Sequence, residues 1–294
     1  MSVTHAVATL GRGPGRARSL TEGEAEAAME EVLSGDAAPE AVGALLMLLR
    51  MKGETAEEIA GFVRAARRSL DLAARGVALD WPCYAAGRTR GAPWFLAAAQ
   101  RVAQQGTPVL LHGAGPQLPV IRAGLADLGV TEARDAGHAL DVLERDGIAF
   151  VALSAVSPAL LRLLELRAVF GLRSCINTVL RMLNPFGAAA QVQGVFHPSY
   201  RALQADAAAL LGQPGLVCLK GGGGEFERHP GKPATLFGLR RGVRFETVLQ
   251  PAIGDTRRLT EAEGTLSAPC AFGRATINAT VGAAALAFDH LVPA

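Results

Sequence analysis

RAVFGLRSCINTVLRMLNP, residues 167–185, is the most specific segment of the chain. Most of its side chains are apolar, so we expect it to pack against a core. Gly171 and Pro185 are residue types that fix turns. Arg173 and Arg181 place positive charge on the same segment. The segment therefore combines a buried scaffold with cations that can hold an anionic group.

Short apolar runs on both sides of this segment indicate buried strands. They are VLLHG from Val109, IAFVAL from Ile148, VQGVF from Val192 and LVCLKG from Leu216. Helical patterns alternate with them, among them PWFLAAAQRVAQQ, PSYRALQADAAALL and the final ATINATVGAAALAF. This alternation predicts a mostly parallel sheet covered on both faces, with ligands at the carboxyl ends of the strands.

The N-terminal part has a purely helical pattern. Thr21 and Glu24 have the spacing of a capping box, and so do Thr55 and Glu58. Between these pairs, a segment that begins at Pro39 and ends at Gly53 matches helix start and stop signals. We therefore predict an α/β protein with a small all-helical N-terminal domain, residues 1–75, and a larger, mostly parallel α/β domain, residues 76–294.

Leucines in the segment from Pro39 to Gly53 offer more apolar surface than a three-helix unit can hide internally. These are Leu45, Leu46, Leu48 and Leu49. We therefore predict that the N-terminal helices contact a second copy of the chain and form a homodimer.

Composition narrows the class of protein. Half of the 294 residues are hydrophobic, 19% are charged, and no run approaches the roughly 18 apolar residues of a membrane span. The four cysteines lie far apart without a CxxC pair, which fits a reducing cytoplasm without zinc or disulfides. Residues 1–20 lack an apolar core after a basic start, so we interpret them as a frayed basic tail and not as a signal peptide.

Residues 167–185 resemble the RxxLGxRTxFNxLGPLxNP segment of anthranilate phosphoribosyltransferases and the wider glycosyltransferase family 3. The positions in register are Arg167, Gly171, Arg173, Asn177, Asn184 and Pro185. Upstream, IAFVALSAVSPAL is similar to the family's strand and HPA turn, and downstream QGVFHPSY is similar to its GVF strand and following helix. The resemblance implies a nucleoside phosphorylase or phosphoribosyltransferase-like fold, with a substrate cleft that includes Gly87, Gly113, Arg167 and Asn177.

Three ligand segments of that family are altered here. The glycine-rich GTGGD loop and the Asn-Ser-Thr stretch that bind pyrophosphate correspond to YAAGRTRGAPWFLA, residues 84–97, which lacks the aspartate and contains Arg88 and Arg90. Only His112 and Gly113 match the family's KHGNR segment. The HGxDGLDE loop, whose Asp-Glu pair binds Mg²⁺, corresponds to KGGGGEFER from Lys220. There the carboxylates of Glu225 and Glu227 alternate, which disfavours shared coordination of one ion.

These changes remove ligands for one pyrophosphate and add cations, which can hold a chain of phosphates without reading its sequence. Nearby aromatic residues could stack bases if exposed: Trp81, Tyr84, Trp94 and Phe95. We expect Trp94 and Phe95 to pack in the core instead, because they open an Ala-rich helix. Residues 228–258 also carry seven Lys or Arg against two acids, which indicates either a polyanion-binding surface or a solvated face.

The pattern WPCYAAGR, together with GLRSCINT and KGGGGEFER, is similar to the YbiB-like branch of the family, which implies nucleic-acid binding in place of anthranilate phosphoribosyltransferase activity. We therefore predict a cytoplasmic homodimer that binds single- or double-stranded nucleic acid through phosphates, with no membrane partner and no cofactor. The predicted nucleic-acid or phosphate-binding residues are Arg88, Arg90, His112, Arg173, Arg181, Lys220, Arg228 and Lys232.

Two alternatives remain open at the level of the sequence. One is a transferase or phosphorylase that uses phosphoribosyl pyrophosphate and an unknown acceptor, with Mg²⁺ held by Glu225 and Glu227. The other is a relic of such an enzyme that binds a small phosphorylated ligand for regulation.

Overall fold

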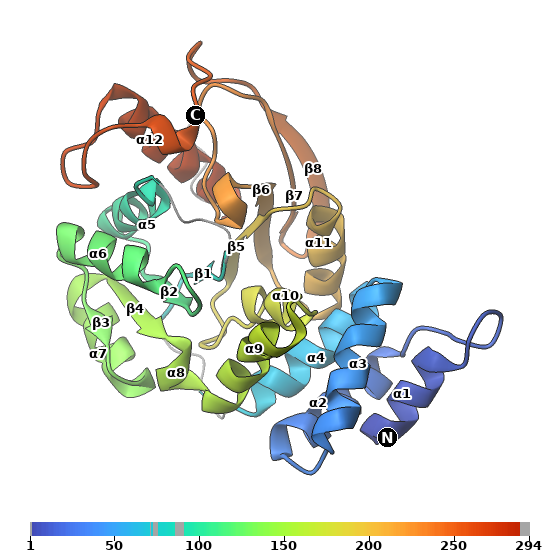
Figure 1. The fold of residues 1–294 in the computed structure, drawn as a ribbon. Helices are drawn as coiled ribbons and strands as arrows, with labels where there is room; N and C mark the ends of the chain where they lie inside the picture. Colours follow the sequence, from blue (N-terminus) through green and yellow to red (C-terminus); the bar gives the residue numbers. More distant parts are fainter. Residues whose placement is uncertain (1, 71, 73–75, 86–90, 289–294) are drawn as a thin grey trace.

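A computed structural model describes residues 2–70, 72, 76–85 and 91–288 of the chain (Figure 1). These residues form an eight-stranded sheet with the order β3-β4-β2-β1-β5-β6-β7-β8. Strands β1 to β6 pair in parallel, while β7 pairs antiparallel with both β6 and β8. The bounds are β1 Leu79–Cys83, β2 Val109–Gly113, β3 Glu132–Ala133, β4 Ile148–Ala152, β5 Ala190–Val195, β6 Gly215–Lys220, β7 Ala234–Arg240 and β8 Val243–Leu249.

Helices cover both faces of this sheet, as the alternating pattern predicts (Figure 1). On one face α5 (Trp94–Gln104), α6 (Leu118–Leu128) and α12 (Ala271–Ala285) enclose one apolar core. The other face is covered by α7 (Ala136–Asp146), α8 (Leu153–Val156), α9 (Pro158–Phe170), α10 (Ile176–Arg181) and α11 (Tyr200–Leu210). The N-terminal helices lie on this second side. They are α1 (Val3–Gly11), α2 (Glu22–Ser34), α3 (Pro39–Lys52) and α4 (Ala56–Arg68).

Strand β1 is central although it contains a proline, Pro82, which cannot donate a ladder hydrogen bond. The registers of the two neighbours explain how the sheet tolerates it. Strand β2 pairs along all of β1, whereas β5 pairs only with Leu79 and Asp80. Pro82 therefore lies beyond the end of the β5 ladder.

Residues 3–11 do not belong to a frayed tail, which the composition of residues 1–20 suggested. Val3 to Gly11 form helix α1, in which the Ser2 hydroxyl accepts a hydrogen bond from the His5 N–H. The side chains of Val3 and Leu10 are buried against the other N-terminal helices. Apolar residues at helical spacing outweigh the basic residues that follow them.

The leucines of α3 do not form a free apolar face. Leu45, Leu46 and Leu49 are at most 1% exposed, and Leu48 packs partly buried against the same core. The chain itself covers this surface, because α1 packs against α3 and the core continues into α9, α10 and α11. The leucines of α3 therefore give no support to the predicted homodimer, which stays a prediction.

Buried hydrogen bonds join the N-terminal helices to the α/β part. Arg67 of α4 donates from Nε to the Leu183 carbonyl at 2.8 Å and from Nη2 to the Met182 carbonyl at 2.9 Å. Burial lowers the pKa of Arg67 to about 10. The two parts share one core, and the predicted division into residues 1–75 and 76–294 stays a prediction.

Cysteines and apolar helices add two further facts about the fold. Cys83, Cys175 and Cys218 are buried, whereas Cys270 is partly exposed and accepts a hydrogen bond from the Gly273 N–H at the start of α12. No helix within the described ranges is long and apolar enough to cross a membrane.

Candidate functional site

Two adjoining cavities lie near the carboxyl ends of the parallel strands. The first, which we call the arginine cleft, has a volume of about 470 Å³. The second, which we call the apolar cavity, has a volume of about 660 Å³ and shares Arg167, Gly171 and Asn177 with the first. The arginine cleft is lined by Arg50, Arg173, Arg181, His197 and Tyr200 among others, and the apolar cavity by Tyr84, Ala114, Pro116, Leu161 and Leu164 among others.

Positive charge is concentrated in the arginine cleft. The pKa of Arg173 is lowered by burial and by the neighbouring charges of Arg167 and Arg50. An arginine keeps its proton despite such a shift, so the cations repel one another. An anion placed among them relieves this repulsion, and the guanidinium groups can bind a carboxylate or a phosphate bidentately.

A buried polar chain runs behind the apolar cavity from Tyr84 to the centre of the sheet. The Tyr84 hydroxyl lies 2.9 Å from His112 Nδ1, and His112 Nε2 lies 3.1 Å from Asp80 Oδ1. Gln191 Nε2 donates to Asp80 Oδ2 at 2.9 Å. Burial, followed by the charge of Asp80, raises the pKa of Tyr84 well above its ordinary value. The phenol therefore keeps its proton, and its hydroxyl shares a hydrogen bond with His112 Nδ1.

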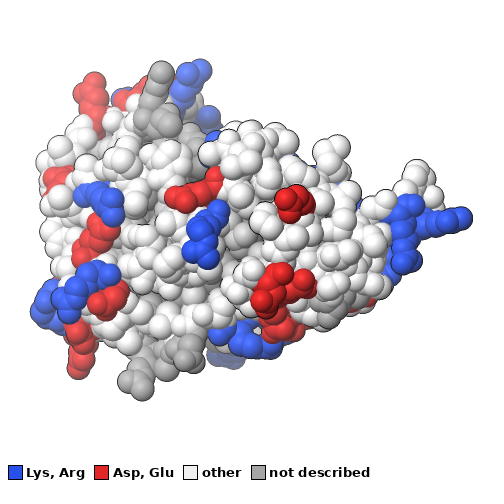
Figure 2. Space-filling view, turned by 60° about the horizontal axis from the view of Figure 1, so that its bottom comes forward, with Lys and Arg blue, Asp and Glu red and all other residues white. Residues whose placement is uncertain are grey.

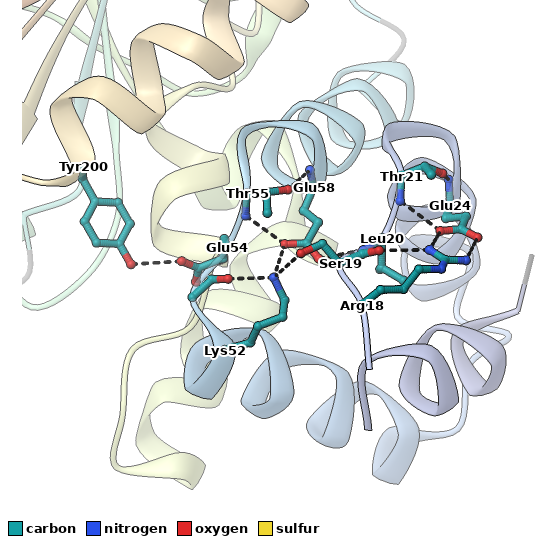
Figure 3. A network of polar contacts seen from close by, with 11 residues as sticks. Arg18, Ser19, Leu20, Thr21, Glu24, Lys52, Glu54, Thr55, Glu58 and Tyr200 are labelled. Carbon is teal, nitrogen blue, oxygen red and sulfur yellow. Dashed lines mark hydrogen bonds and ion pairs between the residues drawn. The ribbon is translucent and has the colours of Figure 1, made fainter. Parts of the chain in front are cut away.

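The N-terminal helices reach the cleft through the turn between α3 and α4 (Figure 3). The Tyr200 hydroxyl, from α11, donates to Glu54 Oε2 at 3.0 Å. Beside it, Lys52 forms an ion pair with the fully buried Glu58 at 2.8 Å. Arg50 precedes this turn, so these contacts fix the N-terminal side of the arginine cleft.

The two carboxylates of the loop after β6 accept hydrogen bonds from two different parts of the fold. Glu225 Oε1 accepts a hydrogen bond from the Ala85 N–H at 3.0 Å, and Glu227 Oε2 accepts one from the Phe95 N–H at 3.0 Å. Within the residues that the structure describes, no three His, Cys, Asp or Glu side chains come together as a set that could hold a metal ion. The magnesium site of the alternative interpretation stays a prediction.

The predicted cations do not form one continuous rim. Arg181 is 8% exposed and donates to the carbonyls of Asn177 and Tyr84, and Arg228 is 7% exposed and bonds to the Gln250 carbonyl. Lys220 and Lys232 are exposed and line neither cavity, whereas Arg173 and Arg181 both line the arginine cleft. Gly87, Arg88 and Arg90 lie outside the described residues.

The cations of residues 228–258 are mostly paired with acids or spread over the surface. Arg244 pairs with Asp206, and Arg257 lies 2.7 Å from Asp255. One face of the molecule shows Lys and Arg side chains interspersed with Asp and Glu (Figure 2). The run is better described as a solvated hairpin than as a polyanion-binding surface.

The aromatic residues beside the altered loop are core residues. Trp81, Tyr84, Trp94 and Phe95 are each at most 1% exposed, so none can stack a base. Gly113 ends β2 against β1, where a Cβ atom would lie 2.4 Å from the Cys83 carbonyl oxygen. The absence of a side chain at Gly113 therefore allows β1 and β2 to approach each other.

Arg50 and Tyr200 are site residues that sequence reasoning did not identify. Arg50 lies on an N-terminal helix, far along the chain from residues 167–185. No local pattern distinguishes it from a surface arginine at the end of a helix. The packing of α4 against α10 and α11 brings the N-terminal helices, and Arg50 with them, to the cleft.

Comparisons with known proteins identify the class to which this fold and site belong. Residues 4–70 match the helical bundle domain of the glycosyl transferase family. The structure of anthranilate phosphoribosyltransferase from Thermus thermophilus aligns with a TM-score of 0.78 and 23% identity, covering 97% of this chain and 88% of that one. The Saccharomyces cerevisiae enzyme, solved in complex with phosphoribosyl pyrophosphate and Mg, aligns with a TM-score of 0.66 and 18% identity, covering 83% of this chain and 71% of that one. The fold is thus that of phosphoribosyltransferases with an N-terminal helical bundle.

Sequence relatives narrow the class further. The anthranilate phosphoribosyltransferase of Rubrobacter xylanophilus is 34% identical over 249 residues, which cover 76% of this chain and 71% of the relative. That of Pelotomaculum thermopropionicum is 34% identical over 241 residues, which cover 79% and 69%. The chain belongs to the anthranilate phosphoribosyltransferase family.

This membership corrects the functional prediction from the sequence. The relatives are named anthranilate phosphoribosyltransferases, which supports the transferase alternative and not nucleic-acid binding. The prediction failed because it counted arginines without knowing their partners, and two of them, Arg181 and Arg228, donate to backbone carbonyls. The likeness to the YbiB-like branch is not supported by these comparisons.

Proposed function

We propose that this chain transfers a phosphoribosyl group from phosphoribosyl pyrophosphate to a small aromatic acceptor that carries a carboxylate. The observation that supports this proposal best is the joining of the arginine cleft to the apolar cavity through Arg167 and Asn177. A charged region beside an apolar one suits a molecule with an anionic end and an aromatic body. The family relatives support the transfer of the phosphoribosyl group.

The chemistry proposed is displacement at the anomeric carbon of the ribose. The acceptor nucleophile forms a bond to this carbon while the bond to pyrophosphate breaks, and the leaving group carries away the bonding electrons. Arg173, with Arg167 and Arg50, would hold the acceptor carboxylate, and the leucines of α9 would exclude water from its ring. Residues 84–97 depart from the family's pyrophosphate loop, so the donor contacts in this chain are its own.

Anthranilate is the first acceptor to test, because the relatives are named for it. When phosphoribosyl pyrophosphate is added, we expect the fluorescence of anthranilate to decrease and pyrophosphate to be released. Donor binding without turnover of any carboxylate-bearing aromatic acceptor would support the ligand-binding relic. Failure of the donor to bind, with or without Mg²⁺, would reject the proposal.

Arg173→Ala tests the role of the cleft. We expect the KM for the acceptor to rise by about tenfold to a hundredfold, since a hydrogen bond to a charged group contributes about 1.5–3 kcal/mol. Arg162→Ala is the matched control, because Arg162 is exposed on α9. An equal change in both variants, or a change in kcat alone, would contradict an acceptor-binding role for Arg173.

A further inference from the structure

The arginine cleft contains more positive charge than one carboxylate can balance. Arg50, Arg167 and Arg173 line it, and their side chains form no ion pair or hydrogen bond within the part of the chain that the structure describes. Arg181 also lines the cleft, and the charge of Glu225 acts on it. No Asp or Glu is among the described residues that line this cleft. A bound monocarboxylate would therefore leave at least two guanidinium groups without a counter-charge.

These cations lie close enough to act on one another. The pKa of Arg173 is lowered by burial and then by the charges of Arg167 and Arg50. The pKa of Arg181 is lowered by burial, raised in part by Glu225 and lowered again by Arg173. All of these guanidinium groups stay charged, so the repulsion among them decreases with each negative charge that a ligand brings.

Helix ends bring these arginines together. Arg50 lies in the last turn of α3, Arg167 in the last turn of α9 and Arg181 in the last turn of α10. Gly171, with a φ of 66°, ends α9 in the left-handed region, and Arg173 follows this turn into the cleft. The C-terminus of a helix carries about half a negative charge, which stabilises a nearby cation without neutralising it. The fold therefore tolerates the cluster and leaves charge for a ligand.

The arginine cleft has room for more than the carboxylate of an acceptor. Its volume of about 470 Å³ lies in the range of pockets that hold a whole small ligand. Asn177, which is 7% exposed, lines both cavities, and its side-chain amide makes no hydrogen bond with another described residue. An amide donates and accepts, so it suits a polar substituent at the junction of the cavities. A ring in the apolar cavity thus leaves the arginine cleft to the anionic substituents.

We propose that the aromatic acceptor of this chain carries two negative charges, on two carboxylates or on one phosphate group, and that Arg50, Arg167 and Arg173 bind them together. Guanidinium groups bind both kinds of anion bidentately. The role of this ligand as an acceptor rests on the proposed transferase function. The preference of the cleft for a dianion stands on the charges and the volume of the cleft alone.

Calorimetry with three ligands that share one ring tests this preference in the absence of donor. Benzoate carries one charge, phthalate carries two carboxylates, and phenyl phosphate carries two charges on one group at pH 8. We expect at least one dianion to bind about tenfold or more tightly than benzoate at low salt, and the advantage to decrease as salt is added. The tighter dianion identifies the anionic group. Benzoate binding as tightly as both dianions, or no binding of any of the three, would overturn the proposal.

Arg50→Gln tests the second charge, because Arg50 is exposed at the end of α3 and its replacement leaves the core intact. We expect the affinity for the preferred dianion to fall by about tenfold and that for benzoate by about threefold or less. Arg162→Gln is the matched control, since Arg162 is also exposed on a helix and lines neither cavity. Equal losses for dianion and benzoate in Arg50→Gln, or the same loss in Arg162→Gln, would contradict the proposal.

The failure of this inference is distinguishable from the failure of the proposed function. If a dianion binds with the expected preference and no acceptor is turned over, the transferase function fails and the dianion site stands. If anthranilate is turned over and neither dianion binds more tightly than benzoate, the transferase function stands and the dianion site is rejected.

Discussion

Tyr84 begins the segment that corresponds to the family's pyrophosphate loop, and its hydroxyl forms a hydrogen bond with His112. We predict that Tyr84→Phe lowers the free energy of unfolding by about 1–3 kcal/mol, because a buried imidazole nitrogen loses its partner. Urea denaturation measures this loss. Tyr200→Phe is the control: its hydroxyl bonds the partly exposed Glu54, so we expect a smaller effect. Equal stability of parent and Tyr84→Phe would show that the contact contributes nothing.

At the same scale, sequence identified some site residues and not others for physical reasons. Arg167, Arg173 and Asn177 share one segment, and the structure brings them to the same pair of cavities. The orientation of the Arg181 side chain could not be predicted from the sequence, because Arg181 donates to the Tyr84 carbonyl just after β1. A backbone carbonyl needs a side-chain hydrogen-bond donor of this kind only where distant segments pack together.

Among elements, helix α2 begins with a capping box that is tied to an arginine outside the helix. Glu24 accepts from the Thr21 N–H at 2.9 Å and from Arg18 at 2.6 and 2.7 Å. The hydrogen bonds of Arg18, and then that of the Thr21 N–H, lower the pKa of Glu24 to about 2 from 4.5. The folded state therefore binds the proton less readily than the unfolded state does.

The sign of this shift gives a pH prediction. Glu24 contributes stability above its unfolded pKa near 4.5, and the contribution is lost as pH falls toward the folded value of about 2. We predict that Glu24→Gln lowers the Tm at neutral pH and that the gap to the parent narrows as pH falls through this window. Thermal melts across the acid range measure the gap. A gap that is independent of pH would contradict the role of the carboxylate charge.

Helices α2 and α4 cross at a glycine. A Cβ atom on Gly61 would lie 2.2 Å from the Glu22 carbonyl oxygen and 2.9 Å from the Ala25 Cβ. We predict that Gly61→Ala forces the helices apart and costs about 1–3 kcal/mol in urea denaturation. Gly23→Ala is the control, since nothing lies within 4 Å of that position, and it leaves stability unchanged or raises it. Similar effects of both substitutions would contradict a close crossing.

Elements with a clear local signal were predicted, and one hairpin was not. The capping boxes of α2 and α4 and the strands β2, β4 and β6 were predicted from caps and apolar runs, and the structure has all of them. Strands β7 and β8 were missed because their segment was read for its charge. Its alternating apolar residues and the turn at Arg241 and Gly242, both with positive φ, carried the hairpin signal.

At the scale of the whole molecule, one of the apolar cores extends from the N-terminal helices into the α/β part. We predict a single cooperative unfolding transition, because neither part can open without exposing the shared core and the Arg67 hydrogen bonds. Trp81 and Trp94 report the α/β part by fluorescence, and hydrogen exchange of α4 reports the helices. Early exchange of α4 amides, while β5 amides stay protected, would show an independent helical domain.

Cys270 gives the molecule a natural point for attaching a probe. Burial raises the pKa of Cys83 and Cys175 well above the ordinary value and that of Cys218 to about 12, so these thiols are poor nucleophiles at neutral pH. Cys270 alone is partly exposed, at the start of a helix on the face of the sheet opposite the N-terminal helices. A maleimide dye or spin label would therefore mark one defined site on the unaltered sequence, and no cysteine need be removed first.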